Sequence, residues 1–350
     1  MDRRLTVGLA AAALSAVAWS LLQLPASAAS ARSTTSPLGT VTVAFAGDIA
    51  LLGPAPGSLF SGVRGQLRRA DVAIGNLEGT LGSGGTSKCK KGSTGCFAFQ
   101  SPAASAALLR GAGFDDLNVA NNHAFDYGAV GEQQTLRALA RHKLRWSGRP
   151  GQVTILRVRG IRVAVLGFAP YPWAQSLLDI PAAQRLVHRA AARADVVVAV
   201  LHAGAEGAAH QHVPYGTEHY LGENRGNERR FAHALVAAGA NLVVASGPHV
   251  LRGMQVFHGA PIAYSVGNFA TAGGALATDG VLGEGAIVVI TLSRDGQLVS
   301  GRLVPVRIVG GAPRRIYGSI DVVRRVNALS RADFHKSAML VEDDDTLRVG

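Results

Sequence analysis

The chain has 350 residues, of which 48% are hydrophobic and 17% are charged, and its formal net charge is +12. This length suits one large α/β domain with appendages, and the apolar share is enough for a sizeable core. The basic residues are scattered arginines without interleaved aromatic residues, which argues against nucleic acid as a partner. An anionic polymer, a phosphate group or the envelope surface remains as the expected partner.

The first 28 residues carry the features of an export signal. Arg3-Arg4 precedes an apolar stretch from Leu5 to Leu24, and Ala26-Ser27-Ala28 matches a cleavage site for signal peptidase. The apolar stretch is also just long enough to span a bilayer, so an uncleaved membrane anchor is the alternative. Both interpretations place the rest of the chain outside the cytoplasm, either secreted or anchored by its N-terminus. Residues 29–39 are predicted to form a flexible linker.

From residue 40 onward, short β-branched runs alternate with amphipathic stretches rich in Ala, Leu and Arg. This alternation predicts an α/β fold with layered sheets and helices. The predicted strands are 41–46, 72–75, 116–120, 153–157, 161–168, 196–201, 242–245, 263–266 and 286–292. The predicted helices are 62–69, 102–111 with Ser101 as N-cap, 130–142, 182–194 and 227–238. The dipeptides Arg159-Gly160 and His258-Gly259 predict hairpin turns.

Two further features concern the domain boundaries and the cysteines. Residues 40–310 are predicted to form the main domain and residues 311–350 a C-terminal extension, because the pattern weakens from about Arg314. The acidic cluster 342–345 is most simply a solvated end. Cys89 and Cys96 lie in a loop rich in Gly, Ser and Lys. In an exported protein they favour a local disulfide, whereas two cysteines without a nearby pair of histidines make a poor zinc site.

Polar side chains follow five of the predicted strands at the point where each strand ends. They are Asp48, Glu78, the Asn121-Asn122-His123 triplet, His202 with Glu206, and His249. Each of them alone can be explained as a cap, a turn residue or a core histidine. Ligands of open α/β sheets bind beyond the carboxyl ends of the strands, and carboxylates, amides and imidazoles suit Mn, Fe or Zn. The repeated placement therefore favours a functional cleft with bound metal.

Six ordered blocks between about residues 41 and 292 resemble the CapA family of poly-γ-glutamate capsule biosynthesis proteins. The blocks are Ala46-Gly47-Asp48, Gly75-Asn76-Leu77-Glu78-Gly79, Ala120-Asn121-Asn122-His123 with Asp126-Tyr127-Gly128, His202-Ala203-Gly204-Ala205-Glu206, Gly247-Pro248-His249-Val250 and Tyr264-Ser265-Val266-Gly267-Asn268-Phe269. The resemblance implies a four-layer α/β/β/α sandwich of the metallophosphoesterase type. It also implies one or two divalent metal ions.

The resemblance further implies a role for each matching residue. The implied metal ligands are Asp48, Glu78, Asn122, His202 and His249. The implied catalytic residues are His123, as a general acid, together with Asp126 and Glu206. The implied substrate-binding residues are Asn76, Asn121, Arg225 and Asn268.

Two positions depart from the phosphoesterase pattern. Ile49-Ala50 follows Asp48 where an Asp-x-His block has its histidine, and Gly247 stands where a His-x-His block has its first histidine. Two metals, one metal, weakly held metal or none are therefore all open, and Glu206, His210 and His212 are candidates to substitute. The loop from Leu221 to Gly226 presents Arg225 either as an anion-binding fork or as half of a surface ion pair.

Two classes of function follow from these features. The first is a metal-dependent hydrolase or transferase that acts on a phosphate ester or on an anionic polymer of the capsule or cell envelope. The second is a non-catalytic accessory protein that binds an anionic polymer or a membrane synthase complex. An envelope phosphatase without a capsule role is a third possibility, because fold does not determine function.

Overall fold

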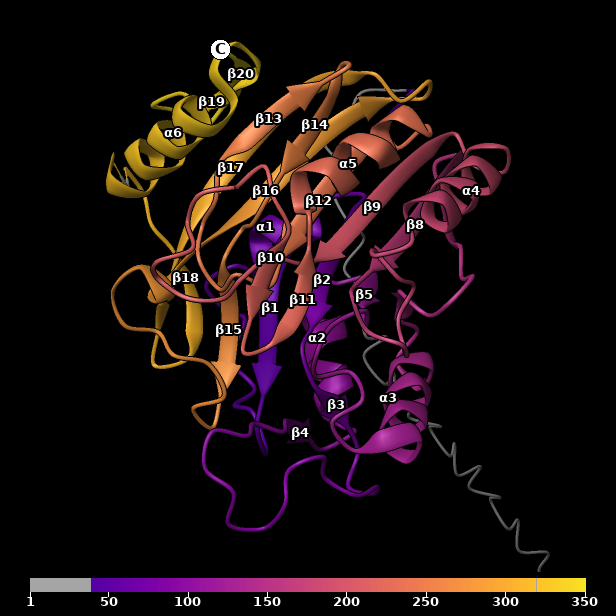
Figure 1. Ribbon diagram of the computed structural model, residues 1–350, viewed down its shortest axis with the longest axis vertical. Helices are drawn as coiled ribbons and strands as arrows, with labels where there is room; N and C mark the ends of the chain where they lie inside the picture. Colours follow the sequence, from indigo (N-terminus) through magenta and orange to yellow (C-terminus); the bar gives the residue numbers. More distant parts are fainter. Residues whose placement is uncertain (1–38, 319) are drawn as a thin grey trace, which may run out of the picture. The chain divides into compact units, whose positions relative to one another are not determined.

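Two mixed β-sheets pack face to face, with helices on their outer faces, in the computed structural model, which describes residues 39–318 and 320–350 (Figure 1). The predicted export signal and residues 29–38 of the predicted linker lie outside the described residues. Within the described part of the chain, no helix has the length and apolar character that a membrane span requires.

The larger sheet has the strand order β18-β17-β16-β1-β2-β5-β6, and β15 pairs with β1 beside this path. Strands β2, β5, β6 and β15 run parallel to their neighbours, whereas β16, β17 and β18 are antiparallel. The strand bounds are β1 (Thr40–Leu51), β2 (Val72–Leu77), β5 (Asp116–Asn118), β6 (Arg145–Ser147), β15 (Asn268–Ala272), β16 (Glu284–Ser293), β17 (Leu298–Val309) and β18 (Ala312–Arg315).

The second sheet has the order β13-β14-β12-β9-β8-β7, with a parallel centre and an antiparallel hairpin at each edge. Its strands are β7 (Thr154–Val158), β8 (Ile161–Phe168), β9 (Val196–His202), β12 (Leu242–Ser246), β13 (Met254–Phe257) and β14 (Ala260–Ala263). The predicted turns at Arg159-Gly160 and His258-Gly259 join these hairpins, and all four residues have the positive φ that the favoured two-residue turns require.

The helices cover the outer face of each sheet. Helices α1 (Arg64–Arg69), α2 (Ser105–Ala112) and α3 (Gly128–Arg141) share one core with the larger sheet, and α4 (Ile180–Ala191) and α5 (Glu228–Ala237) share another with the second sheet. A third core lies between the sheets, where Val43 and Phe45 of β1 meet Val163 and Val198. The four-layer α/β/β/α architecture predicted from the resemblance is therefore confirmed.

The alternation of side chains in β1 explains how one strand serves two cores. Val41, Val43 and Phe45 belong to the core between the sheets, whereas Ala44 and Ala46 face the helices. Successive side chains of a strand point to opposite faces, so alternate residues of β1 enter different cores. The continuous apolar run 196–201 predicts burial on both faces for β9, and its alternate residues do lie in the core between the sheets and in the core shared with α4 and α5.

Two local predictions are wrong. The helix predicted from Pro102 begins at Ser105 instead, because Ser101 lies in β4 (Gln100–Ser101), where its hydroxyl bonds Gly53 O and Ser105 Oγ rather than capping a helix. Strand β4 pairs with β3 (Thr80–Leu81). The strand predicted at 263–266 is also misplaced, since β14 ends at Ala263 and the next strand, β15, begins at Asn268.

The C-terminal residues continue the same unit, without a break at the expected boundary near residue 310. Helix α6 (Ile320–Phe334) places Val322 and Val326 in the core between the sheets, and the hairpin β19 (Met339–Val341) and β20 (Leu347–Val349) follows it. Asp345 of the acidic cluster pairs with Arg315 at 3.0 Å. The cluster is therefore not simply a solvated end.

Candidate metal centre

The polar residues predicted at the strand ends do meet at one edge of the two sheets. Glu78 directly follows β2, His202 is the last residue of β9, and His249 comes three residues after β12. Asp48 differs from the prediction because it lies inside β1, at a shift in the pairing register with β2 and β15. Gly47 permits this shift, since a Cβ at that position would lie 1.8 Å from the Gly267 carbonyl oxygen.

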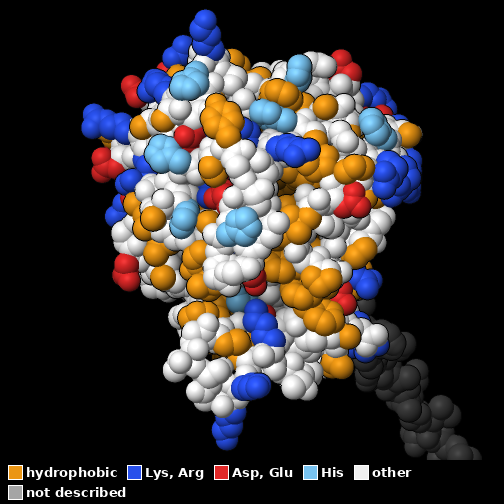
Figure 2. All heavy atoms as spheres, in the orientation of Figure 1, with side chains coloured by type: hydrophobic (Ala, Val, Ile, Leu, Met, Phe, Trp, Pro, Cys, Tyr) orange, Lys and Arg blue, Asp and Glu red, His pale blue; other side chains and the backbone are white. Residues whose placement is uncertain are grey.

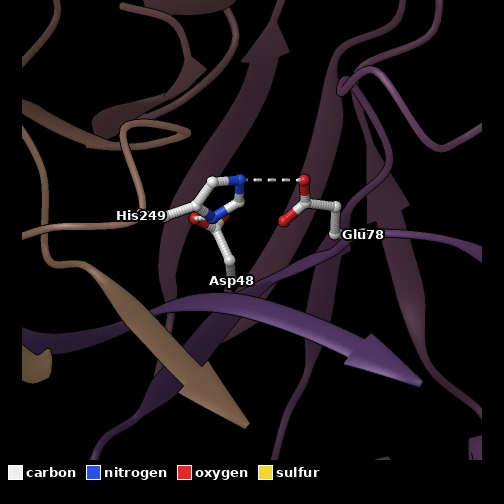
Figure 3. A group of neighbouring side chains, drawn as sticks. All are labelled: Asp48, Glu78 and His249. Atoms are coloured by element: carbon white, nitrogen blue, oxygen red, sulfur yellow. Dashed lines mark ion pairs between the residues drawn. The ribbon is translucent and has the colours of Figure 1, made fainter. Parts of the chain in front are cut away.

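Asp48, Glu78 and His249 form the centre of this group (Figure 3). Their ligand atoms all lie within 4.8 Å of one another. The His249 ring lies between the two carboxylates, with Nδ1 3.2 Å from Asp48 Oδ2 and Nε2 3.7 Å from Glu78 Oε1 (Figure 3). Two carboxylates and an imidazole at this spacing are a ligand set suited to Mn, Fe or Zn.

Glu78 is the least satisfied member of the group. Its side chain is fully buried, yet neither carboxylate oxygen has a hydrogen-bond partner among the described residues. The imidazoles of His249, His202 and His123 face Glu78 Oε1 at 3.7, 3.9 and 4.0 Å, which is beyond hydrogen-bond reach. A buried carboxylate without partners is costly, so this donor set fits a divalent cation in contact with Glu78.

The surroundings shift the pKa values of the three residues in different directions. Burial raises the pKa of Glu78 well above its usual value, and the nearby Asp48 and Glu206 raise it further, against His249. Burial also acts to raise the pKa of Asp48, but contacts with His202 and His249 outweigh it and hold this pKa well below its usual value. Burial opposes the protonation of His249, but Glu78 and Asp48 raise its pKa to about 10. The carboxylates of Asp48 and Glu78, with Glu206 nearby, thus gather negative charge that a bound cation would neutralise.

A chain of buried amides orients these ligands. Asn76 Nδ2 donates to Asp48 Oδ1 at 2.7 Å, and Asn76 Oδ1 accepts from Asn118 and Asn121 at 2.9 and 3.1 Å. Asn268 Oδ1 lies 2.9 Å from His249 Nδ1. Asn76, Asn121 and Asn268 were predicted to bind substrate, but they are buried and engaged with the ligands or with one another. They hold the site in place instead.

His123 lies beside the centre and is held by two charged residues. Its Nδ1 is 2.7 Å from Asp126 Oδ2, and the Lys88 ammonium is 2.6 Å from Asp126 Oδ1. The ring stacks on Phe99 at 4.2 Å, which leaves Nε2 facing Glu78. Burial lowers the pKa of His123, although Asp126 acts in the opposite direction.

Lys88 and Asn118 were missed by the sequence analysis. Lys88 adjoins the disulfide that joins Cys89 and Cys96 with Cα atoms 5.6 Å apart, so the loop that appeared only to carry a bridge also reaches the site. A polar residue inside an apolar strand was the available signal for Asn118, between Leu117 and Val119.

Glu206 and Arg225 close the site from the loops of the second sheet. Arg225 belongs to β11 (Glu223–Gly226), which pairs with β10 (Glu218–Tyr220). Its guanidinium is buried, with Nη1 2.7 Å from Glu206 Oε1. The alternative prediction, a surface ion pair, is wrong because Arg225 is buried. Its contact with the half-exposed Glu223, at 3.6 Å, reaches the surface only on the Glu223 side.

Of the three candidate substitute ligands, only Glu206 reaches the centre, with Oε2 3.7 Å from His249 Nε2. His212 is exposed and pairs with Asp333 at 2.8 Å. The His210 ring packs against Tyr220. Asn122 lies at the rim, where Nδ2 donates to Glu206 at 3.4 Å, and its buried Oδ1 has no hydrogen-bond partner among the described residues.

The family described as "Bacterial capsule synthesis protein PGA_cap" matches residues 42–272 of this chain. The chain belongs to this family. The match includes Asp48, Glu78 and His249, and it confirms the resemblance that the six sequence blocks predicted.

Two curated relatives of the chain carry the name that the resemblance predicted. The "Capsule biosynthesis protein CapA" of Bacillus anthracis is 28% identical over 69% of this chain and 59% of its own length. The "PGA biosynthesis protein CapA" of Bacillus subtilis (strain 168) is 29% identical over 61% of this chain and 56% of its own length. The chain thus spans less than three fifths of the length of these relatives.

Among solved structures, a 5'-nucleotidase precursor from Thermus thermophilus is similar to this chain, with a TM-score of 0.47 and 12% identity. The similarity covers 84% of this chain and 59% of that one. At this level the similarity carries no inference about function.

Proposed function

We propose that this PGA_cap protein is a metal-dependent hydrolase or transferase that works outside the cytoplasm on an anionic polymer of the capsule or cell envelope, or on a phosphate ester. The observation that carries the proposal is Glu78, a buried carboxylate without hydrogen bonds that faces three imidazoles. A purely structural core would not retain so costly a group.

Asp48, Glu78 and His249 would hold the metal ion, a Mn, Fe or Zn ion, with Asn122 and His202 next to them. When bound, such an ion would lower the pKa of a water molecule and supply hydroxide as a nucleophile. The buried amides keep the ligands in register, since Asn76 bonds Asp48 and Asn268 bonds His249.

His123 would move the proton. Asp126 accepts from Nδ1, and Lys88 anchors Asp126 from the other side, so the ring keeps Nε2 turned towards the centre. The neutral imidazole would accept at Nε2 the proton that the attacking water loses, and the protonated ring would then donate that proton to the leaving oxygen. The contact between Asp126 and Nδ1 stabilises the protonated form during this step.

The substrate class rests on the names of the relatives and on charge. Both relatives are named for capsule or PGA biosynthesis. The net charge of +12 favours an anionic partner. On the face seen in Figure 2, Lys and Arg side chains are dispersed over the margins and the middle, with Asp and Glu between them. No single basic patch of the described residues dominates this face, so the net charge alone supports an anionic partner.

Export is part of the proposal and rests on the N-terminal sequence features. The mature protein should begin near Ala29 if the signal is cleaved, and N-terminal sequencing of the protein from its source would test this. A chain that begins at Met1 in the cytosol would contradict export, whereas Met1 retained in the membrane would indicate the anchor.

A non-catalytic accessory protein that binds an anionic polymer or a synthase complex is the second candidate. The specific observation in its favour is that Ala50 and Gly247 occupy two positions where the phosphoesterase pattern has imidazoles. Fewer ligands weaken metal binding, and a cleft can keep its shape after catalysis is lost.

The His123→Ala variant separates the two candidates. With Mn²⁺ supplied, aryl phosphate mono- and diesters and γ-glutamyl polymer serve as substrates, and turnover should fall about 10²- to 10⁴-fold while metal content stays unchanged. His212→Ala is the matched control, because its imidazole is exposed and lies outside the site. Unchanged turnover in His123→Ala would reject the proton-transfer role. Salt-sensitive polymer binding without turnover on any substrate would favour the accessory protein.

A further inference from the structure

Arg225 is a fixed positive charge inside the candidate metal centre. It is only 1% exposed, and its Nη2 lies 3.5 Å from His202 Nε2. Its other donors reach Glu206 at 2.7 Å, the Tyr171 hydroxyl at 2.9 Å and the Gly204 carbonyl at 3.0 Å. A guanidinium has five N–H groups, so at most one is left for a substrate. The anion-binding fork considered from sequence is therefore not available.

The contact with Arg225 engages the nitrogen of His202 that a metal would use. His202 Nε2 faces both Glu78 Oε1, at 3.9 Å, and the Arg225 guanidinium, at 3.5 Å. On the other side, Nδ1 lies 3.7 Å from Asp48 Oδ1 and 3.2 Å from Asn76 Nδ2. A guanidinium N–H can only donate, so the Arg225 N–H group lies where a second metal ion would have to approach Nε2.

The backbone at Gly247 excludes another imidazole at that position. Gly247 has a φ of +115°, which disfavours any side chain. A Cβ would also lie 2.9 Å from the Ala203 carbonyl oxygen, 3.0 Å from the Ala203 nitrogen and 3.3 Å from the His202 ring. The Gly247 N–H instead donates to Asp48 Oδ2 at 3.2 Å. The missing ligand is therefore built into the local fold.

The charges of the site balance with one metal ion. Three largely buried carboxylates meet here, from Asp48, Glu78 and Glu206, and carry three negative charges when ionised. The fourth carboxylate nearby, Glu223 at 3.6 Å from Arg225 Nη1, is half exposed, so solvent screens its charge. One divalent cation together with the Arg225 guanidinium carries three positive charges. A second divalent ion would place an unbalanced double charge in a buried site beside a guanidinium, which is costly.

We propose that the centre holds one divalent ion, at Asp48, Glu78 and His249, and that the Arg225 guanidinium takes the place of a second cation. This inference rests on the proposed function, because it concerns the same site. Arg225 would then neutralise the side of Glu78 that faces His202 and would present a constant positive charge to an anionic substrate.

Mn²⁺ alone is the probe for the test. The metal-free full chain is titrated with Mn²⁺, the bound ions are counted by elemental analysis after gel filtration, and electron paramagnetic resonance reports whether ions are coupled. We expect one ion per chain with the spectrum of an isolated Mn²⁺. Two ions, or a spin-coupled pair, would overturn the inference and leave the proposed function standing. No bound Mn²⁺ would overturn both.

Variants of Arg225 sharpen the result. Arg225→Met removes the charge but keeps most of the length, and it should admit a second Mn²⁺, so that the count rises from one to two. Arg225→Lys keeps a positive charge and should stay at one. A count that remains at one in folded Arg225→Met would overturn the role of Arg225, and thermal unfolding of each variant establishes that it is folded. The count in the wild type tests the inference even if a variant does not fold.

Discussion

Two buried clusters of charge adjoin each other at the loop after β9, where Ala205 bonds Arg252 and Glu218, and they are built differently. In one, Arg252 Nη2 and Nη1 bond Glu218 and Glu228 at 2.6 and 2.9 Å. In the other, the candidate metal centre, Glu78 meets the three surrounding imidazoles only at 3.7 Å or more. In the first cluster each carboxylate bonds Arg252, although Glu228 Oε1 has no hydrogen-bond partner among the described residues, whereas in the second neither oxygen of Glu78 has one.

The contrast separates a structural charge cluster from a functional one. Arg252 also bonds the His210 carbonyl at 2.9 Å, and Glu218 accepts from the Ala205 N–H at 3.1 Å, so this cluster holds the loop that carries Glu206. Burial raises the pKa of Glu228 to about 8, against the effect of Arg252. Pairing supports local structure, and incomplete pairing marks the place where a ligand binds.

The largest effect is expected from removing Arg252, the cation that bonds both carboxylates of the first cluster. Arg252→Met leaves Glu218 and Glu228 buried without their cation, which should lower the free energy of unfolding by about 3–5 kcal/mol. Urea denaturation followed by circular dichroism measures this change. The triple variant Arg252→Met, Glu218→Gln, Glu228→Gln should recover part of the loss, because no charge is then left unpaired. A single variant as stable as the wild type would contradict the structural role.

The next effect concerns the candidate metal centre. His249→Ala removes one of three ligands and should weaken Mn²⁺ binding by more than the roughly 10- to 100-fold that loss of an outer partner costs. His212→Ala, which changes an exposed imidazole paired with Asp333, should leave affinity unchanged. Calorimetric titration compares the two. Equal affinities in both variants would remove His249 from the centre.

A lone buried carboxylate provides an intermediate case. Burial raises the pKa of Asp116 to about 7, against the hydrogen bond from Ser147. The stability linked to its protonated form is full below the unfolded value of about 4 and is lost as pH rises through 7. Asp116→Asn should therefore gain about 1–3 kcal/mol over the wild type at pH 8 and little at pH 4. Urea denaturation at both pH values measures the difference, and equal gains would contradict this linkage.

The smallest expected effect measures how much the buried Glu78 carboxylate destabilises the metal-free protein. Glu78→Gln removes a buried charge without partners and should stabilise the metal-free protein by about 1–2 kcal/mol while it weakens Mn²⁺ binding. Thermal unfolding with and without Mn²⁺ shows both changes. If the metal-free variant is less stable than the wild type, the ion pair with His249 already stabilises the Glu78 carboxylate, and Glu78 is not an unpaired charge.

The sequence blocks predicted which residues gather, because strand ends in an α/β fold meet at one edge. Asp48, Glu78, Asn122, His123, His202 and His249 came from this rule together with the family resemblance, and the structure brings them together. The rule did not identify Lys88, Asn118 or Tyr171. Their contacts reach across 38, 42 and 54 positions of the chain, and no local pattern encodes such partners.

The sequence by itself determined the alternation of strands and helices, the two hairpin turns and the set of candidate ligands, since hydrophobic period, turn residues and block order are local properties. Only the tertiary structure decided that Asp48 lies at a register shift and that residues 311–350 complete the core. It also decided that Arg225 is buried beside His202 and that Gly247 has no room for an imidazole. These outcomes depend on distances between segments far apart in the chain, which packing sets and periodicity does not encode.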